Sequence, residues 1–131
     1  MSANAQVPLP LHELEAEVMQ GVWSSDQEEV TVRKVMDALN KRKKHPRAYT
    51  TYMTIMRRLD TKGLLTRRRE GKTDIYRPVY TREQYADLRA RAGVSQLVEE
   101  YGEVALSHFA RQMAELDPHR RRQLQRLARK S

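Results

Sequence analysis

The sequence predicts a mainly α-helical protein with a small β-hairpin wing: a winged helix-turn-helix domain followed by a C-terminal helical region. Three observations lead to this fold class. Apolar residues recur at helical spacing in three consecutive segments, a basic Gly-containing segment with extended flanks follows the third, and a long apolar period then begins. We expect residues 1–9 to form a disordered arm, residues 10–80 the winged-helix domain and residues 81–131 the helical region.

The first helix is expected from Leu11 to Trp23. Its apolar positions repeat every three or four residues, and the acidic residues between them are favoured near a helix N-terminus. The apolar positions are Leu11, Leu14, Val18, Met19, Val22 and Trp23, and the acids are Glu13, Glu15 and Glu17. The polar run from Ser24 to Asp26 breaks the pattern, so the helix should end before it.

The second helix should begin after Thr31, because threonine is a favoured N-cap residue. Its apolar stripe consists of Val32, Val35, Met36 and Leu39, and it closes near Asn40. Residues 28–30, just before it, are expected to form a short extended bridge. The segment after it, Lys41 to Tyr49, should be a basic turn, because Pro46 disfavours helix at the residue before it.

The stretch from Arg47 to Leu65 predicts a third helix with two different faces, since successive residues turn by about 100° in a helix. The apolar stripe is Tyr52, Ile55, Met56 and Leu59, and the opposite side carries Thr50, Thr54, Arg57 and Thr61, flanked by Thr51, Arg58 and Met53. Threonine and arginine side chains suit base edges and phosphates. We therefore interpret this segment as a recognition helix that stops at Lys62-Gly63.

Two short strands are expected next, at residues 64–69 and 75–80, with residues 70–74 as a Gly-containing turn. A hairpin after a helix-turn-helix is a wing. Its basic residues are Arg67, Arg68, Arg69 and Lys72. At the tip of a wing they would lie along a sugar-phosphate backbone.

A fourth helix should start after Thr81, which forms a capping box with Gln84. Apolar positions then continue as far as Leu116. We expect Gly93 and Gly102 to bend or divide this segment, and Asp117-Pro118 to begin a last helix. So long an apolar face cannot all fold back on a small domain, so we predict a homodimer. Its dimerisation residues are Leu88, Leu97, Val98, Tyr101, Leu106, Phe109, Met113, Leu124 and Leu127.

The charge of the chain is concentrated in one segment. The 131 residues carry a net charge of +8, and residues 41–72 hold twelve Lys and Arg against two acids. A focused basic patch is what attraction to a polyanion such as double-stranded DNA requires. The residues expected to contact phosphate are Lys44, Arg47, Arg57, Arg58, Arg67, Arg69 and Lys72.

Several function classes are disfavoured. There is no cysteine, and the four histidines are scattered, so we expect no metal and no cofactor. No Gly-rich phosphate loop or acid–base pair suggests an enzyme. The N-terminal residues resemble neither a signal peptide nor an anchor, and no long apolar run occurs, so we expect a soluble, cytoplasmic protein without membrane insertion.

The sequence resembles the winged-helix repressors of beta-lactamase and methicillin-resistance genes, the penicillinase-repressor family. The resemblance covers nearly the whole chain, and its most specific part is the run from Ala48 to Leu65 followed by Tyr76-Arg77-Pro78-Val79. The other matching stretches are LEAEVMQGVW, TVRKVMDAL and IYRPVYTREQY. The resemblance implies a homodimeric repressor of transcription that binds palindromic operators. It also implies base contacts from Thr50, Thr51, Met53 and Thr54.

Family members are commonly inactivated by cleavage in the dimerisation region after a membrane sensor-protease signals antibiotic exposure. The resemblance places the matching bond here between His108 and Phe109, where the best-known members have Asn before the Phe. Phe109 as an ordinary dimer-core residue is an equal alternative. The copper-responsive branch binds metal through a cysteine-rich tail, which this chain lacks.

Other functions remain open on the sequence alone. The recognition segment could be a surface helix that is merely basic, and the winged helix could serve only as a protein-interaction or RNA-binding module without operator specificity. The Arg-rich end, residues 120–130, could favour RNA or a membrane surface. Its lack of Trp and Phe argues against membrane insertion, and the aromatic residues elsewhere fall at expected core positions, away from base stacking.

Overall fold

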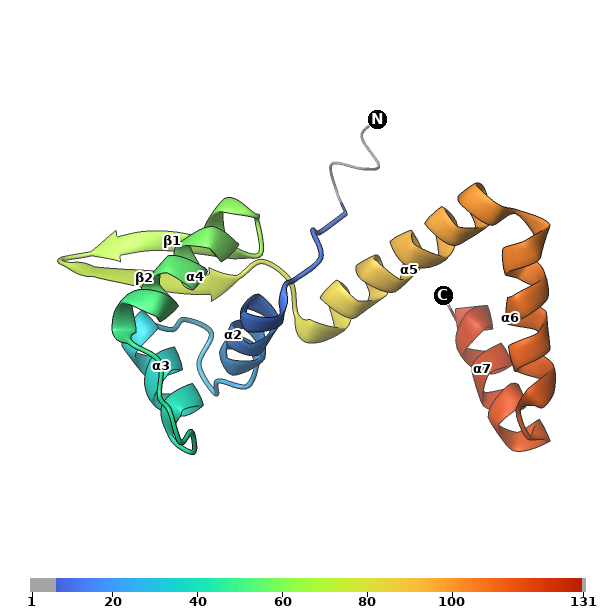
Figure 1. Ribbon diagram of the computed structural model, residues 1–131, viewed down its shortest axis with the longest axis horizontal. Helices are drawn as coiled ribbons and strands as arrows, with labels where there is room; N and C mark the ends of the chain where they lie inside the picture. Colours follow the sequence, from blue (N-terminus) through green and yellow to red (C-terminus); the bar gives the residue numbers. More distant parts are fainter. Residues whose placement is uncertain (1–6, 131) are drawn as a thin grey trace. The chain divides into compact units, whose positions relative to one another are not determined.

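The computed structural model describes residues 7–130 of the chain (Figure 1). Within these residues, three helices precede a two-stranded antiparallel sheet, and three further helices follow it. The elements are α2 (Glu13–Trp23), α3 (Val32–Asn40), α4 (Tyr49–Thr61), β1 (Leu65–Glu70), β2 (Thr73–Pro78), α5 (Arg82–Tyr101), α6 (Glu103–Glu115) and α7 (Pro118–Lys130). This order of three helices and a hairpin confirms the predicted winged helix-turn-helix fold.

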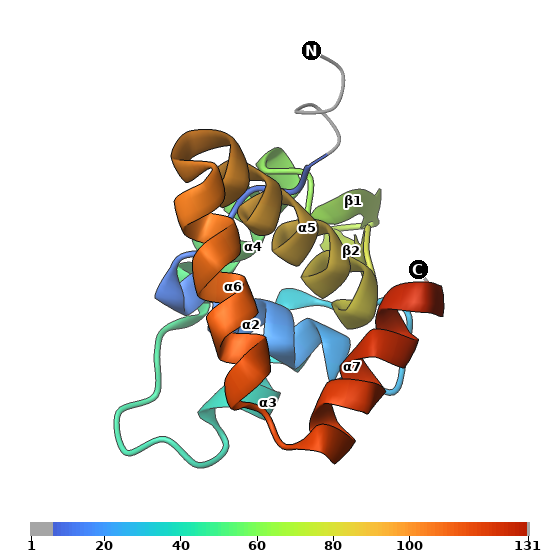
Figure 2. The ribbon, with the colours of Figure 1, turned by 90° about the vertical axis from the view of Figure 1, so that its right-hand side faces the viewer.

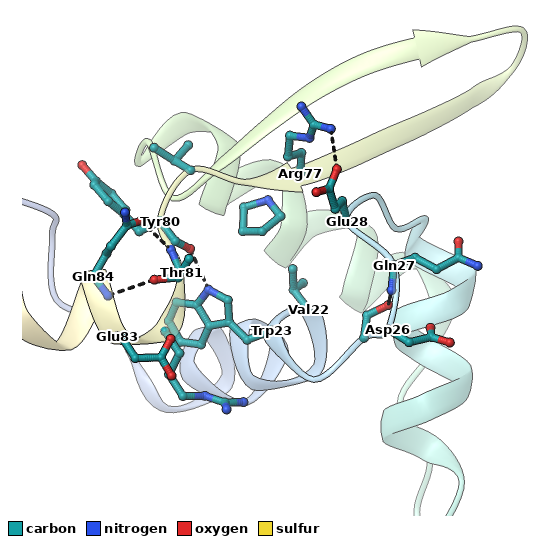
Figure 3. A pocket seen from close by; sticks show the side chains of 14 residues that line it. Val22, Trp23, Asp26, Gln27, Glu28, Arg77, Tyr80, Thr81, Glu83 and Gln84 are labelled. Atoms are coloured by element: carbon teal, nitrogen blue, oxygen red, sulfur yellow. Dashed lines mark hydrogen bonds and ion pairs between the residues drawn. The ribbon is translucent and has the colours of Figure 1, made fainter.

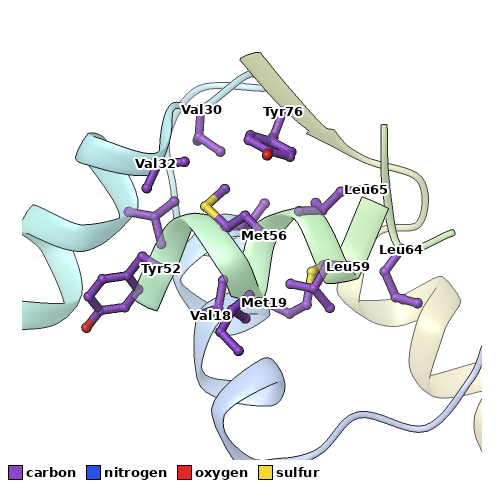
Figure 4. Close-up of a cluster of buried hydrophobic side chains, with 13 residues drawn as sticks. Val18, Met19, Val30, Val32, Tyr52, Met56, Leu59, Leu64, Leu65 and Tyr76 are labelled. Atoms are coloured by element: carbon purple, nitrogen blue, oxygen red, sulfur yellow. The ribbon is translucent and has the colours of Figure 1, made fainter. Parts of the chain in front are cut away.

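The core lies where α2, α3 and α4 meet the hairpin (Figure 4). All four residues of the predicted α4 stripe are buried, and so is Tyr76 of β2. Burying a large apolar side chain contributes about 1.5–3 kcal/mol. The buried set is Val18, Met19, Val22, Val30, Val32, Val35, Tyr52, Ile55, Met56, Leu59, Leu64, Leu65 and Tyr76. The amphipathic pattern of the sequence therefore identified which side of α4 faces inward.

The helix boundaries differ from expectation only at some ends. Helix α3 has the predicted bounds, and the Thr31 hydroxyl caps it by accepting a hydrogen bond from the Lys34 N–H at 3.1 Å. The first helix begins at Glu13 rather than Leu11, and α4 occupies only the middle of the predicted stretch. It ends at Lys62-Gly63 as expected, where Gly63 adopts a φ of +84°.

The wing turn is shorter than predicted. Strand pairing continues to Glu70 and Thr73, so Gly71 and Lys72 alone form the turn, in place of the expected turn over residues 70–74. Gly71 has a φ of +63°, a conformation that two-residue hairpin turns need and glycine adopts readily. The expected extended bridge is present at its last residue, because Val30 pairs with Tyr76 in both directions at 2.8 and 2.9 Å.

The connection from the wing to α5 is fixed by polar contacts (Figure 3). The predicted capping box is present: the Thr81 N–H donates to the Gln84 side chain, and the Gln84 N–H donates to the Thr81 hydroxyl, at 2.9 and 3.0 Å. The Trp23 indole N–H donates to the Tyr80 carbonyl at 2.9 Å. The exit from β2 is therefore anchored to the end of α2.

The predicted helical region forms α5, α6 and α7. Gly93 does not interrupt α5, whereas Gly102, with a φ of +56°, separates α5 from α6. Helices α6 and α7 are joined at Leu116 and Asp117 and turn back on each other (Figure 2). Arg121, from the Arg-rich end, is half-buried and donates to the carbonyls of Met113, Ala114 and Leu116 at the end of α6.

The described chain forms two compact units, which divide between Ala90 and Arg91. The domain boundary predicted from sequence, after residue 80, lies just before α5, and the first turns of α5 belong to the same compact unit as the winged helix. Residues 1–6 of the expected N-terminal arm lie outside the described residues. Within residues 7–9, the carbonyls of Pro8 and Leu9 accept hydrogen bonds from Arg89 and Tyr85. None of the helices formed by residues 7–130 is long and apolar enough to cross a membrane.

Candidate nucleic-acid interface

The outer face of α4 presents short hydroxyl side chains and a guanidinium group. Thr50, Thr54 and Arg57 are exposed, and Thr51 is half-buried beside them. Neither the Thr50 nor the Thr54 hydroxyl forms a hydrogen bond with any residue from 7 to 130. Hydrogen-bonding groups left free on one face of a rigid helix are available to a ligand. Met53 is less available to a ligand, because its side chain is half-buried and packs against the core.

The N-terminus of α4 is held by Asn40, a residue that the sequence analysis did not single out. Its side-chain amide donates to the Arg47 carbonyl at 2.9 Å, and its side-chain oxygen accepts from the Arg47 N–H at 3.1 Å. The Tyr52 hydroxyl donates to the same oxygen at 2.7 Å. These contacts fix the end of the basic turn against α3 and α4. Only the fold brings Asn40 to Arg47, so no local sequence signal marks it.

Replacing Asn40 by Ala is expected to destabilise the fold by about 1–3 kcal/mol, because each of its hydrogen bonds contributes about 0.5–1.5 kcal/mol. It should also weaken duplex binding, since the first turn of α4 loses its brace. Urea unfolding and fluorescence anisotropy would measure the two effects. Tyr52→Phe removes a single hydrogen bond, so it should reduce both the stability and the duplex affinity by less than Asn40→Ala does. Unchanged stability in Asn40→Ala would contradict this assignment.

The basic turn is tied to α2 through Glu17. This carboxylate lies 2.8 Å from the Lys43 ammonium and 2.9 Å from the Arg47 guanidinium. The hydrogen bond from Lys43 lowers the pKa of Glu17, and burial opposes it. Lys44 is exposed and makes no ion pair with any described residue. Lys44, like Lys41 and Arg42 of the same turn, therefore carries a charge that no described carboxylate neutralises.

The C-terminus of α4 is tied to the buried carboxylate of Glu15 in α2. Glu15 is only 1% exposed, and the Lys62 ammonium lies 2.7 Å from its Oε1. The His12 N–H donates to the same oxygen at 3.0 Å, and the Arg58 guanidinium lies 4.0 Å from Oε2. Burial raises the pKa of Glu15, but the Lys62 and His12 hydrogen bonds outweigh it, so that the pKa lies below its ordinary value.

Glu15→Gln is expected to destabilise the protein by about 2 kcal/mol at pH 7, because it leaves Lys62 without its carboxylate. A carboxyl whose pKa is lowered by folding contributes stability above its unfolded-state pKa. That contribution disappears as the pH falls through the lower, folded-state pKa. Thermal melts between pH 7 and pH 3 should therefore show a smaller loss of stability on acidification in Glu15→Gln. Equal acid losses in both proteins would contradict the role given to Glu15.

The two faces of the wing carry different ion pairs. On the face toward α4, Arg57, Arg67 and Arg69 surround the carboxylate of Asp74 at 3.4 to 3.5 Å. Arg67 also lies 3.4 Å from Asp60. Strand residues alternate between faces, so Arg67 and Arg69 share a side from which Arg68 is excluded. The wing cations predicted as one group are thus divided between two sides.

On the opposite face, Arg68 pairs with Glu29 at 2.8 Å and also contacts Glu70. The hydrogen bond from Arg68 lowers the pKa of Glu29. Arg77 pairs with Glu28 at 3.1 Å. Lys72, at the turn, is exposed and has no ion pair within the described part of the chain. The wing tip therefore presents Lys72 without a competing carboxylate.

The residues predicted to bind phosphate differ in whether a carboxylate already pairs with them in the free protein. Lys44 and Lys72 have no carboxylate partner among residues 7–130. The others have at least one, and these are Arg47, Arg57, Arg58, Arg67 and Arg69. A phosphate must compete with these carboxylates. The side chains of these arginines are between 37% and 60% exposed, so a phosphate can reach each guanidinium group.

The predicted dimerisation residues are not buried within the protomer. The exposed ones are Leu97, Tyr101, Leu106 and Leu127, and the half-buried ones are Leu88, Val98, Phe109, Met113 and Leu124. Helices α5 and α7 contain no buried residue, and Ala105 is the only buried residue of α6. His108 is exposed, and the His108–Phe109 bond lies inside α6.

Comparison with known proteins identifies one family and two similar regulators. Residues 11–130 match the family described as penicillinase repressor. Two curated proteins named transcriptional regulator BlaI, from Mycobacterium tuberculosis strains CDC 1551 / Oshkosh and ATCC 25618 / H37Rv, are each 39% identical to this chain over 74 residues. The matched part is 56% of this chain and 51% of each relative. The chain therefore spans about half the length of the curated relatives that it matches.

A solved structure is also similar. It is the solution structure of the DNA-binding domain of the repressor BlaI, with 26% sequence identity and a TM-score of 0.48. The match covers 61% of this chain and 92% of that one.

Proposed function

Because the chain belongs to the penicillinase repressor family, we propose that it is a DNA-binding transcriptional repressor that acts as a homodimer on palindromic operators. The observation that carries the proposal is the outer face of α4, where Thr50, Thr54 and Arg57 stand clear of the core beside a basic wing. Such a face combines groups that discriminate bases with groups that hold phosphate.

In this proposal α4 enters the major groove. Thr50, Thr51 and Thr54 hydrogen-bond to base edges or contact thymine methyl groups, and Met53 adds an apolar contact at the edge of the helix. The braces at the two ends of α4, Asn40 and Glu15, hold it in a fixed position on the domain. A fixed helix loses less conformational entropy when it binds.

Phosphate contacts would position the domain on the duplex. Lys44 beside the N-terminus of α4 and Lys72 at the wing tip supply uncompeted positive charge. The paired arginines add to it after exchanging a carboxylate for a phosphate. Phosphate contacts carry affinity and make it fall with salt, whereas the base contacts of α4 carry the sequence preference.

The helical region supports the homodimer. Large apolar side chains are exposed there to between 44% and 62%, namely Val94, Leu97, Tyr101, Val104, Leu106 and Leu127. Several large exposed apolar side chains in one region of a protein are typical of an interaction surface. A second copy would cover this surface and place two recognition helices on two half-sites, which is how two-fold symmetric proteins read palindromes.

Selection of bound DNA from a random duplex pool tests the proposal. The purified full chain should enrich an inverted repeat whose half-sites are separated by one helical turn of DNA or a multiple of it. In parallel, RNA hairpins of the same length should be retained less than the selected duplex. No enrichment from the pool, or preferred binding to RNA, would favour the alternative of a module without operator specificity.

Regulation by proteolysis would act on the same dimer. A protease that answers a membrane sensor could separate the subunits by cutting His108–Phe109, but this bond is helical, so one turn of α6 must first unwind. The alternative is that Phe109 only packs in the dimer interface. Intact-mass analysis of the protein from β-lactam-treated cells distinguishes them: a fragment ending at His108 supports cleavage, and an undivided chain in derepressed cells contradicts it.

A further inference from the structure

Asp74 stands among basic side chains on the face of the wing that is turned toward α4. One of its oxygens lies 3.5 Å from the Arg57 guanidinium and 3.4 Å from that of Arg67, and its other oxygen lies 3.5 Å from Arg69. Arg57 belongs to α4, whereas Arg67 and Arg69 belong to β1. A single carboxylate therefore links the recognition helix to the wing.

Burial distinguishes the carboxylate from its partners. The side chain of Asp74 is 11% exposed, but those of Arg57 and Arg69 are 49% and 60% exposed. The arginines can therefore reach an outside ligand while Asp74 stays beneath them. Asp74 is also directly paired with Arg69 across the strand ladder, which fixes its position in the wing.

Asp74, Arg57 and Arg69 also line a hollow of about 480 Å³ between the start of α3, α4 and the wing tip. Its basic lining residues are Arg33, Arg57, Arg69 and Lys72, and Asp74 is the acid among its lining residues. A hollow with this charge beside the recognition helix suits a backbone phosphate. The Asp74 carboxylate holds the guanidinium groups that a phosphate would otherwise attract.

Two consequences follow. First, the negative charge of Asp74 reduces the attraction of these arginines for any duplex, whatever its sequence, because each must exchange a carboxylate for a phosphate. Second, it fixes the angle between wing and α4, so that wing contacts form together with α4 contacts. The first effect lowers the affinity for every duplex alike. The second effect weakens random binding more than binding to a matching site, because only a matching site lets α4 and the wing make their contacts together.

We propose that Asp74 is a specificity-determining, positioning residue of the DNA interface, which restrains Arg57, Arg67 and Arg69 until α4 has engaged its bases. The inference rests on the proposed function and deepens it. Specificity is a difference between two affinities, so it can be raised by penalising the wrong duplex. Asp74 has that role here.

The test compares the full-length protein with Asp74→Asn, which removes the charge and keeps the shape. Fluorescence anisotropy is measured on a random 30-base-pair duplex and on the selected duplex over a salt series. Asp74→Asn should bind the random duplex more tightly, with a slope of log affinity against log salt steeper by about one. Its preference for the selected duplex should fall about tenfold. Asp74→Glu, which keeps the charge, should retain most of the preference.

Glu28→Gln is the matched control, because it neutralises a carboxylate that pairs with Arg77 on the other face of the wing. It should leave the salt slope and the preference unchanged. Thermal melts establish that each variant is folded. If Asp74→Asn left the salt slope and the preference unaltered, or if Glu28→Gln changed them equally, the inference would be overturned but the proposed function would not. Failure of the unsubstituted protein to bind either duplex would overturn the proposed function and the inference with it.

Discussion

Replacing Leu97 and Leu106 together by Glu is expected to convert the protein into monomers and to weaken binding to a palindromic duplex by about 100-fold or more. Both side chains are about half exposed in the protomer, at 44% and 51%, so the protomer itself should remain folded. In a dimer, the same positions would bring unpaired carboxylates into an apolar interface. The loss of affinity reflects the loss of simultaneous binding to two half-sites.

Analytical ultracentrifugation and anisotropy would measure the two effects on the same preparations. The control is Gln96→Glu with Gln112→Glu, which adds the same two charges to exposed positions of α5 and α6 without removing apolar surface. This control should remain dimeric, and its affinity for the duplex should fall only by the amount that two added negative charges cause. Dimers of unchanged stability in the Leu97 and Leu106 variant would exclude these residues from the interface.

Replacing Thr50 and Thr54 by Ala is expected to cost about 1–3 kcal/mol for each lost base contact and to reduce the preference for the selected duplex. Both side chains are exposed and lack hydrogen-bond partners within the described chain, so the fold should not change. Random duplexes should be bound about as well as before, because their affinity comes from phosphate contacts. Competition anisotropy with selected and random duplexes gives the ratio directly.

Thr61→Ala is the comparison for this pair. Thr61 is also exposed on α4, but its hydroxyl donates to the Arg57 carbonyl of the same helix at 3.1 Å, one turn away. Because Thr61 lies in the last turn of α4, Thr61→Ala should leave the preference for the selected duplex unaltered. If Thr50→Ala and Thr54→Ala reduced binding to both kinds of duplex equally, they would not be base-reading residues.

Local patterns predicted the winged helix well. The cap at Thr31, the apolar period of α4 and the capping box at Thr81 each depend on residues within one or two helical turns. Such short-range signals are visible in the sequence. They identified the exposed face of α4 together with its buried face, because the two are complementary on one helix.

The helix and turn ends were harder to predict. Gly93 was expected to bend or divide the helical region, but a glycine inside a helix costs only about 1 kcal/mol, which the remaining turns of α5 absorb. Gly102 divides it because the chain there adopts a positive φ. The wing turn was predicted too long because Glu70 continues the ladder, opposite Thr73, despite the poor strand propensity of glutamate.

The partners of the basic residues could not be predicted from sequence. Asp74 lies seventeen residues from Arg57 along the chain, and Glu15 lies farther still from Lys62, so only the tertiary fold pairs them. The charge count showed where the cations gather but not which of them a carboxylate already holds. Arg121 illustrates the same limit, since a residue in a basic run caps the preceding helix.

The central claim is that two copies of this chain bind one palindromic duplex through their α4 helices. Native mass spectrometry of the complex with the selected duplex tests it most directly. The account predicts two chains on a duplex with both half-sites, and much weaker binding when one half-site is scrambled. One chain on each intact duplex, or a number of chains that rises with duplex length regardless of sequence, would contradict it.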